Sequence, residues 1–375
     1  MKKILNKVFF ISFVILWGVL TVCNLFKSPT EFSENENRYL AKFPAFKIDA
    51  FLEGVFMTDV DIYLDDQFLL RDQWITVQST AEYSAGKREI NGVMIGKDSL
   101  FSRPGAVDED AVSDNLRGIE AFTERYGLPS YLMIVPSAYS VENDKRPALA
   151  YDVNDEEAIG DIYSRASGML TGIDVVSALE DHKEEYIYYR TDHHWTTYGA
   201  YLAYERFCSA LGFSPAAYSA DKISDRFNGT LYSSSGIRFI TPDSMTAFNT
   251  PYDGGCEVLK EGNWEKYDSV YFPEYLNRKD KYAYFLGTNE AAVTLHGTAG
   301  TGKNLLVFKD SYSHCLAPML LAHYDTVTLI DPRYINREVG EIVDAASYDD
   351  VLYLFSFSSF TQENNLVKLM MSAKK

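Results

Sequence analysis

Residues 190–198 read R-T-D-H-H-W-T-T-Y and place an aspartate directly before two adjacent histidines. The chain has only six histidines in 375 residues, and histidine is the side chain that exchanges protons near neutral pH. In an Asp-x-His pair the carboxylate can orient the imidazole and stabilise its charged form, which makes the imidazole a general base. Asp192 and His194 have this spacing, and such a pair needs a nucleophile to activate.

Two other interpretations fit the same residues. The aspartate can cap a helix while the histidines are ordinary surface groups. A metal site would need further ligands, but no second His or Cys cluster and no C-x-x-C pattern accompanies the stretch. We therefore expect no metal and no cofactor, and the acid–base interpretation depends on finding the nucleophile.

A nucleophile is available in N-L-L-V-F-K-D-S-Y-S-H at residues 304–314. Ser311 follows a predicted strand and precedes a predicted helix, whose apolar face contains Leu316, Met319 and Leu320 and which extends to His323. A serine at a sharp strand-to-helix turn presents its hydroxyl above the sheet, beside helix N–H groups that can bind an oxyanion. Serine is also a common N-cap, so the motif becomes informative only together with Asp192 and His194.

The elements that must position these residues can be read from apolar runs. Near-continuous apolar segments are typical of central parallel strands, which are covered on both faces. The Asp-His-His stretch falls between a predicted strand at 185–189 and a helix that begins at Thr196 or Thr197 and ends at Gly212. The pattern predicts an α/β sandwich whose strands include residues 131–136, 304–308, 326–330 and 350–355.

The rest of the globular part shows no internal repeat. Residues 28–50 read as an extended connector, and residues 51–90 and 111–126 have helical spacing. Residues 214–300 change to a texture of Gly, Ser, Tyr and Asn, which predicts an irregular β-containing insertion. We therefore expect one catalytic domain over residues 51–375 that carries this insertion.

The N-terminus predicts a membrane anchor. Lys2, Lys3 and Lys7 precede an apolar run at residues 8–26, which at about 1.5 Å per residue can cross a hydrocarbon core of roughly 30 Å. The lysines favour a cytoplasmic tail, so residues 1–27 form tail and anchor in a single-pass cell-membrane protein whose catalytic domain is extracytoplasmic. A cleaved signal peptide, giving a secreted form, starts in the same way, but no A-x-A site follows the run.

Composition and charge exclude some functions. With 46% hydrophobic and 14% aromatic residues, the chain can bury a sizeable core. The net charge is −18, and because residues 1–27 hold four lysines and no acids, the remainder carries −22. Such a surface repels phosphate backbones, so we expect no nucleic-acid partner. The cysteines beyond the anchor, Cys208, Cys256 and Cys315, are odd in number and form no disulfide framework.

The sequence resembles the DHHW protein family, whose name is the signature found at residues 192–195. That family is similar to the SGNH-like proteins that O-acetylate alginate and other exopolysaccharides. The matching pieces occur in order along the chain and are E-N-R-Y-L-A-K-F-P (36–44), D-Q-F-L-L-R-D (66–72), N-G-V-M-I-G-K-D (91–98), F-N-G-T-L-Y-S-S-S-G (227–236), K-Y-A-Y-F-L-G-T-N (281–289) and K-D-S-Y-S (309–313).

The resemblance implies an α/β, SGNH-hydrolase-like (flavodoxin-like) sandwich with a mainly parallel sheet. It implies a triad of Ser311, His194 and Asp192, with Trp195 packing against or shaping the site and Asn289 as a candidate oxyanion donor. Family members often carry a lysine after the first sheet strand, but Ala138 and Tyr139 stand there, so that loop receives no catalytic role.

The implied function is a membrane-anchored extracytoplasmic O-acetyltransferase that acetylates polysaccharide hydroxyls through an acyl-serine. The implied partners are the polysaccharide acceptor and a multi-spanning membrane O-acyltransferase that supplies acetyl groups. A polysaccharide O-acetyl esterase would use the same triad with water as the acceptor. A non-catalytic glycan-binding or assembly protein is the third interpretation that the sequence leaves open.

Overall fold

The computed structural model describes residues 2–33 and 38–372, which divide into two compact units. The smaller unit runs from the N-terminus to residue 91 and includes residues 233–238. The larger unit contains residues 92–232 and continues from residue 239 to the C-terminal end. The domain boundaries expected from the sequence stay predictions.

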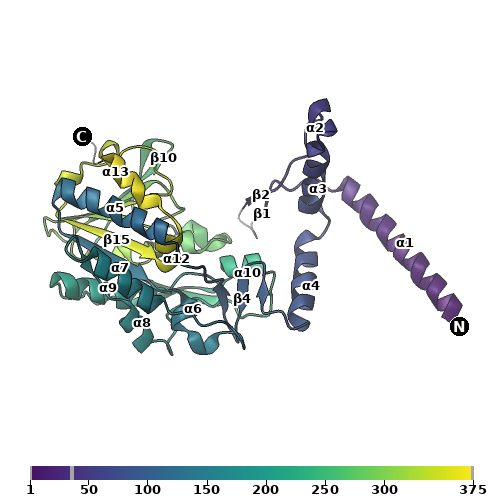
Figure 1. Cartoon of the computed structure of the whole chain (residues 1–375), viewed down its shortest axis with the longest axis horizontal. Helices are drawn as coiled ribbons and strands as arrows, with labels where there is room; N and C mark the ends of the chain where they lie inside the picture. The colour runs from purple at the N-terminus through teal and green to yellow at the C-terminus, as the bar shows by residue number, and fades with distance from the viewer. Residues whose placement is uncertain (1, 34–37, 373–375) are drawn as a thin grey trace. The chain divides into compact units, whose positions relative to one another are not determined.

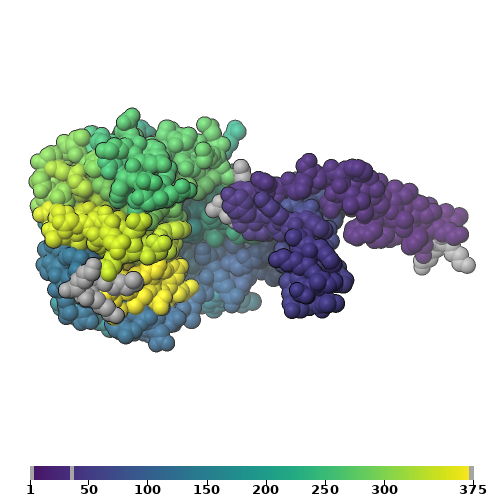
Figure 2. All heavy atoms as spheres, turned by 90° about the horizontal axis from the view of Figure 1, so that it is seen from above, coloured from purple at the N-terminus to yellow at the C-terminus, as the bar shows by residue number. Residues whose placement is uncertain are grey.

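The smaller unit is mainly helical. Its helix α1 is long and apolar enough to cross a membrane over Ile4–Phe26, although a signal sequence would meet the same criterion. Figure 2 shows α1 in purple, largely uncovered by the rest of its unit. The expected helical character of residues 51–90 is confirmed for most of that stretch. The elements of this unit are α1 (Lys2–Phe26), β1 (Phe32–Ser33), β2 (Arg38–Tyr39), α2 (Ile48–Leu52), α3 (Val55–Gln67), α4 (Arg71–Ser84) and β3 (Glu89–Ile90).

The larger unit is built on a mixed sheet with the strand order β11-β10-β12-β14-β13-β15-β6-β7. The strands from β14 to β7 in this order pair in parallel, whereas β11, β10 and β12 add antiparallel pairings at the other edge. The bounds are β6 (Ser130–Val135), β7 (Thr171–Gly172), β10 (Asp253–Lys260), β11 (Asn263–Tyr267), β12 (Ala292–Gly297), β13 (Asn304–Lys309), β14 (Thr326–Ile330) and β15 (Asp350–Ser356). All four strands predicted from apolar runs are therefore confirmed.

Two apolar layers cover the sheet because successive residues of each strand point to opposite faces. On one face Met133, Val135, Leu305 and Val307 pack with helices α8, α9 and α11. On the other face alternate residues of the same strands pack with α5, α7, α12 and α13, and Figure 1 shows α5 beside α12 and α13. The helices are α5 (Glu109–Tyr126), α7 (Asp155–Ala166), α8 (Val176–Asp181), α9 (Thr197–Leu211), α11 (Ala317–Leu320), α12 (Phe357–Gln362) and α13 (Leu369–Ser372).

Shorter elements complete the larger unit. Strands β8 and β9 pair antiparallel, and β4 pairs antiparallel with β5. The insertion expected at 214–300 thus contains a separate hairpin, and its later strands β10, β11 and β12 extend the main sheet. The remaining strands and helix are β4 (Val93–Ile95), β5 (Leu100–Ser102), β8 (Ala220–Phe227), β9 (Asp243–Phe248) and α6 (Ala138–Val141). The 3₁₀ turns are η1 (Asn143–Lys145), η2 (Pro273–Asn277), η3 (Tyr282–Tyr284), η4 (Ser311–Ser313), η5 (Val339–Glu341), η6 (Ala345–Ser347) and η7 (Asn365–Lys368). Helix α10 (Thr230–Ser235) begins in this unit, and its last residues belong to the smaller one.

Two local predictions were wrong. Residues 185–189 form no strand beyond an isolated bridge between Tyr188 and Trp195, because their backbone bonds close a turn on themselves: Tyr189 N donates to His194 O and Thr196 N donates to Ile187 O. The long helix expected after Ser311 is replaced by η4 and the four-residue α11. Pro318 lies in the first turn of α11, and proline, which has no N–H, starts a helix rather than continuing one.

Candidate active site

Ser311 lies two residues after the end of β13, at the carboxyl edge of the parallel strands, where side chains of neighbouring strands meet. The preceding residue fixes this turn: Asp310 accepts hydrogen bonds from Tyr312 N at 2.9 Å and from Ser356 N, at the end of β15, at 2.8 Å. Ser311 is only partly buried, whereas Asp310 and Tyr312 on either side of it are buried. Ser311 is therefore held in a fixed turn without being fully buried.

His194 connects Ser311 to Asp192. Its Nε2 lies 2.8 Å from Ser311 Oγ, and its Nδ1 lies 2.6 Å from Asp192 Oδ1. The same carboxylate oxygen accepts the backbone N–H of His194 at 3.1 Å, so the histidine is held through both its side chain and its backbone. The structure thus brings together the serine, histidine and aspartate that the sequence predicted, in the geometry of a nucleophile, a base and an orienting acid.

Aromatic rings enclose the His194 imidazole. Tyr282 stacks on it with ring centroids 4.0 Å apart and planes 13° apart, and the Tyr312 ring lies 5.1 Å away. The Tyr282 hydroxyl donates to Ser311 O at 3.2 Å, so one residue contacts both the base and the nucleophile's backbone. Trp195 is fully buried and donates its indole N–H to Tyr312 O at 2.9 Å. Its side chain therefore packs behind the site.

Asp192 is kept ionised by its neighbours. Thr230, at the start of α10, donates its backbone N–H at 2.7 Å and its hydroxyl at 3.0 Å to Asp192 Oδ2. Burial alone would raise the pKa of Asp192, but His193, His194 and these donors lower the pKa well below its usual range. Gly229 allows this approach, because a Cβ there would lie 2.3 Å from the Asp192 carboxylate.

His193 has a defined tautomer. Its Nδ1 lies 2.8 Å from Thr230 Oγ1, and the single hydroxyl proton of Thr230 is directed to Asp192. Nδ1 must therefore be the donor, which leaves Nε2 of the neutral ring as an acceptor. Burial and the charge of the adjacent His194 lower the pKa of His193 to about 4, so the ring is neutral at physiological pH.

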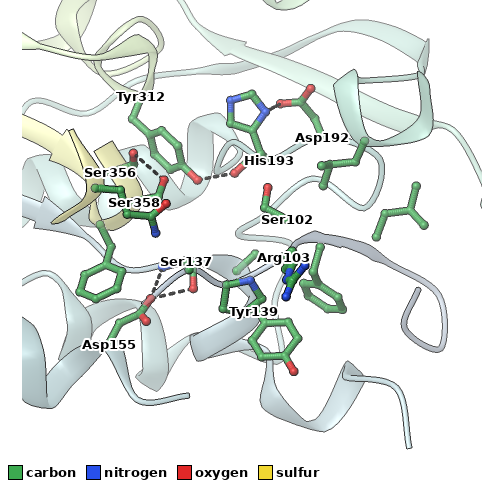
Figure 3. A pocket seen from close by; sticks show the side chains of 18 residues that line it. Ser102, Arg103, Ser137, Tyr139, Asp155, Asp192, His193, Tyr312, Ser356 and Ser358 are labelled. Carbon is green, nitrogen blue, oxygen red and sulfur yellow. Dashed lines mark hydrogen bonds and ion pairs between the residues drawn. The ribbon is translucent and has the colours of Figure 1, made fainter. Parts of the chain in front are cut away.

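His193 lines a hollow of ≈ 70 Å³ (Figure 3). One edge of the ring faces Asp192, and the Tyr312 hydroxyl donates to the backbone carbonyl of His193. Ser137, on the opposite side of the view, donates its N–H and hydroxyl to the buried Asp155, both at 2.7 Å. Most of the lining is apolar, and Arg103, Asp155 and Asp192 add charged groups. Three stretches of chain also contribute uncharged hydroxyl and amide groups, namely Ser102, Ser137, Ser356, Ser358 and Gln362.

The turn that carries the pair is fastened by Asp243, which the sequence did not single out. Asp243 is fully buried and accepts hydrogen bonds from the N–H of Thr191 at 2.8 Å, its hydroxyl at 2.5 Å and Arg190 N at 2.9 Å. Burial raises the pKa of Asp243 despite these donors. The helix start after the pair is as predicted, with Thr196 capping Gly199 N and Gly212 ending α9 in a left-handed conformation.

A metal would have to displace this network. Ligand atoms of Asp192, His193 and His194 lie within 4.8 Å of one another. However, both ring nitrogens of His194 are engaged, one by Asp192 and the other by Ser311. Because both ring nitrogens of His194 are already used in this way, the donor set fits an acid–base pair better than a metal centre.

The oxyanion donors expected from the sequence, Asn289 and the N–H groups after Ser311, stay predictions. Asn289 is exposed in the loop before β12, and the residues around it line a different hollow. At the start of η4, Tyr312 N donates to the Asp310 side chain and Ser313 N donates to Asp310 O at 3.3 Å. Both amides are therefore occupied by Asp310 rather than presented beside Ser311.

The sequence model of the DHHW protein family matches residues 119–330. This chain belongs to the DHHW family. The matched range contains His194, Asp192 and Ser311 and most of the strands of the main sheet. A search of curated proteins gives no significant match to this DHHW protein.

Solved structures share its fold. A DHHW family protein from Eubacterium siraeum aligns with a TM-score of 0.64 and 23% identity, covering 75% of this chain and 95% of that one. PatB1 from Bacillus cereus aligns with a TM-score of 0.61 and 16% identity, covering 73% of this chain and 98% of that one. PatB1 with a sulfonyl adduct aligns with a TM-score of 0.60 and 15% identity, covering 73% of this chain and 96% of that one. The DHHW protein therefore has the SGNH-like α/β fold expected from its sequence.

Proposed function

We propose that this DHHW protein is an extracytoplasmic O-acetyltransferase that acetylates polysaccharide hydroxyls through an acyl-serine at Ser311. The observation that carries the proposal is the continuous hydrogen-bonded path from Ser311 Oγ through His194 to Asp192. Each distance in this path is short enough for direct proton transfer or orientation of the base.

The first half-reaction forms the acyl-serine. As Ser311 Oγ attacks the donor's carbonyl carbon, His194 Nε2 takes the hydroxyl proton, and Asp192 stabilises the imidazolium that results. When the tetrahedral intermediate collapses, the bond to the leaving group breaks and His194 returns the proton to that group. The ester between Ser311 and the acetyl group remains.

The second half-reaction reverses these roles. A sugar hydroxyl gives its proton to His194, attacks the acyl-serine carbonyl and leaves as the acetyl ester while Ser311 regains its proton. The hollow beside His193 combines apolar surface with hydroxyl and charged side chains, and we propose that part of a saccharide binds there. Water in place of the sugar would give an esterase, and the triad alone supports either outcome.

The surroundings favour a charged His194 during the reaction. Tyr282 presents its ring face to the imidazole, and aromatic faces attract cations. This contact is expected to stabilise the imidazolium formed in each half-reaction.

A sulfonyl reagent can probe the proposed reactive serine. PatB1, which has the same fold, is known in a structure with a sulfonyl adduct. Sulfonyl fluorides react with activated hydroxyl groups by losing fluoride, so we expect such a reagent to sulfonylate Ser311.

The setting of the reaction follows from α1 and the flanking charges. With Lys2, Lys3 and Lys7 before the apolar helix, we place the N-terminus in the cytoplasm and the catalytic unit outside. Activated acetyl groups are made inside the cell, so a multi-spanning membrane acyltransferase is the proposed donor partner.

The test is the intact mass of the full chain in detergent after brief incubation with p-nitrophenyl acetate. Wild type should gain one acetyl group, and Ser311→Ala should gain none. Ser313→Ala is the matched control, because this neighbouring hydroxyl is buried and donates to Asp310 O at 2.9 Å. An acetylated Ser311→Ala protein would contradict the proposal.

A second step separates transfer from hydrolysis. The acetylated protein is mixed with an oligosaccharide, and the products are separated by mass spectrometry. Acetylated sugar supports the transferase, whereas release of acetate alone supports the esterase.

A further inference from the structure

The corner between α3 and α4, residues 68–70, is fastened to the end of α1 within the smaller unit. Leu69 N donates to Asn24 Oδ1 at 2.9 Å, and Lys27 Nζ donates to Gln67 O at 3.2 Å. Asn24 lies in the last turn of the helix that is able to cross a membrane. The corner is therefore level with the final residues of that helix.

The chain between the helix and the corner is also held. Gln67 is buried and donates to Thr30 O at 2.9 Å and Ala41 O at 3.2 Å, while its oxygen accepts Thr30 N at 2.8 Å. Asp66 accepts both guanidinium nitrogens of Arg38, at 2.9 and 2.5 Å. Residues 38–41 and 66–67 are thus joined by hydrogen bonds, and the corner is fixed to the helix rather than carried on a loose linker.

The corner itself is apolar and strained. Its residues are Phe68, Leu69 and Leu70, and Leu70 has φ 58 with 53% of its surface exposed. A residue with a Cβ is disfavoured in this left-handed region, where glycine would fit without strain. In water, an exposed leucine side chain gains no burial that would offset the cost of this backbone conformation. At the end of α1, next to Asn24 in the chain, Leu25 and Phe26 are 76% and 86% exposed.

We infer that residues 68–70 enter the outer interface of the lipid bilayer beside α1, so that this unit contacts the membrane at two points. The inference rests on α1 being the membrane anchor of the proposed function. Lipid is the expected partner because the anchor sets the level of the membrane at Asn24, the residue that Leu69 contacts. Entry also requires satisfied backbone groups, and Leu69 N is bonded to Asn24 while Phe68 O accepts Arg71 N.

The test uses the full chain reconstituted in phosphatidylcholine vesicles, with an environment-sensitive NBD label at position 70. The label is attached to Leu70→Cys in a chain that also carries Cys23→Ser, since the other cysteines are buried. We expect a blue-shifted emission that is lost when lipids with shallow doxyl groups are added. Leu149→Cys is the matched control, because Leu149 also has a positive φ, 64, and is fully exposed, but it belongs to the larger unit.

A label on the native Cys23 reports the anchor separately. Quenching at positions 23 and 70 but not at 149 supports the inference. Quenching at 23 without quenching at 70 overturns it and leaves the anchor intact, whereas no quenching at either position overturns both. Quenching at all three positions also overturns it, because the contact would then not be particular to the corner. If Leu70→Cys fails to fold, Leu69→Cys provides the same measurement one residue away.

Discussion

The Tyr282 ring lies flat against the His194 imidazole, with centroids 4.0 Å apart and planes 13° apart. This contact joins η3, which belongs to the insertion, to the turn before α9. Because Tyr282 also donates to Ser311 O, the insertion helps to set the distance between base and nucleophile. The insertion is therefore part of the proposed chemistry rather than a cover over it.

Replacing Tyr282 tests this role. We expect Tyr282→Leu to lower kcat about 10- to 30-fold, since a desolvated cation–π contact contributes about 2 kcal/mol. Tyr282→Phe keeps the ring face and loses only the hydroxyl bonds, so its kcat should fall less than about 5-fold. Turnover of p-nitrophenyl acetate measures both.

The control is Tyr284→Leu, two residues along the same turn, where the ring stacks on Tyr271 instead of His194. It should lower the melting temperature with little change in kcat. Equal losses of kcat in Tyr282→Leu and Tyr284→Leu would show that packing, not stacking on the base, is responsible.

Asp192→Asn should lower kcat by about 10³- to 10⁴-fold. An amide cannot stabilise the imidazolium, and it can hold the ring in the wrong tautomer. Asp155→Asn is the matched change, because Asp155 is also buried but bonds to Ser137 rather than to His194. Single-turnover acetylation followed by mass spectrometry compares the two, and a fully active Asp192→Asn protein would remove Asp192 from the mechanism.

Gly229→Ala should damage the site more than the fold. The added Cβ would lie 2.3 Å from the Asp192 carboxylate, so the bond from Thr230 N to Asp192 must lengthen or the carboxylate must turn away from His194. We expect at least a tenfold loss of kcat, since 1.4 kcal/mol of lost orientation corresponds to a factor of ten.

Gly160→Ala provides the comparison. Gly160 lies within α7 and a Cβ there meets no atom within 4 Å. Alanine should raise stability by up to about 1 kcal/mol, because glycine is a poor residue in a helix interior, and leave kcat unchanged. Chemical denaturation and the acetylation assay on both variants separate the two effects.

The sequence predicts what is local in this site. Asp192 and His194 are two residues apart, and Ser311 follows an apolar strand, so both features are visible in short stretches. Gly229, Asp243 and Tyr282 were missed as individual residues, because they reach the pair through the tertiary course of the insertion. The family pieces F-N-G-T and K-Y-A-Y contain Gly229 and Tyr282 and could have identified these two residues, whereas Asp243 lies in none of the matching pieces.

The main strands were predictable because their apolar runs are local features of the sequence. One strand prediction failed because the hydrogen bonds of that stretch depend on the turn around it. Apolar runs mark β6, β13, β14 and β15 because both of their faces are covered. Residues 185–189 have the composition of a strand, yet their hydrogen bonds are used within the turn that carries His194. The requirement to present the base thus overrides local strand propensity.

The last prediction concerns Glu142, which is buried and paired with Lys145 at 2.8 Å. Burial raises the pKa of Glu142 to about 7, against the lowering effect of Lys145. A carboxyl whose pKa is higher in the folded state than in the unfolded state, where it is about 4.3, costs stability as pH rises between these values. Glu142→Gln should therefore stabilise the protein by about 2 kcal/mol more at pH 8 than at pH 5, as measured by urea unfolding at both pH values. A pH-independent effect of Glu142→Gln on stability would contradict the raised pKa.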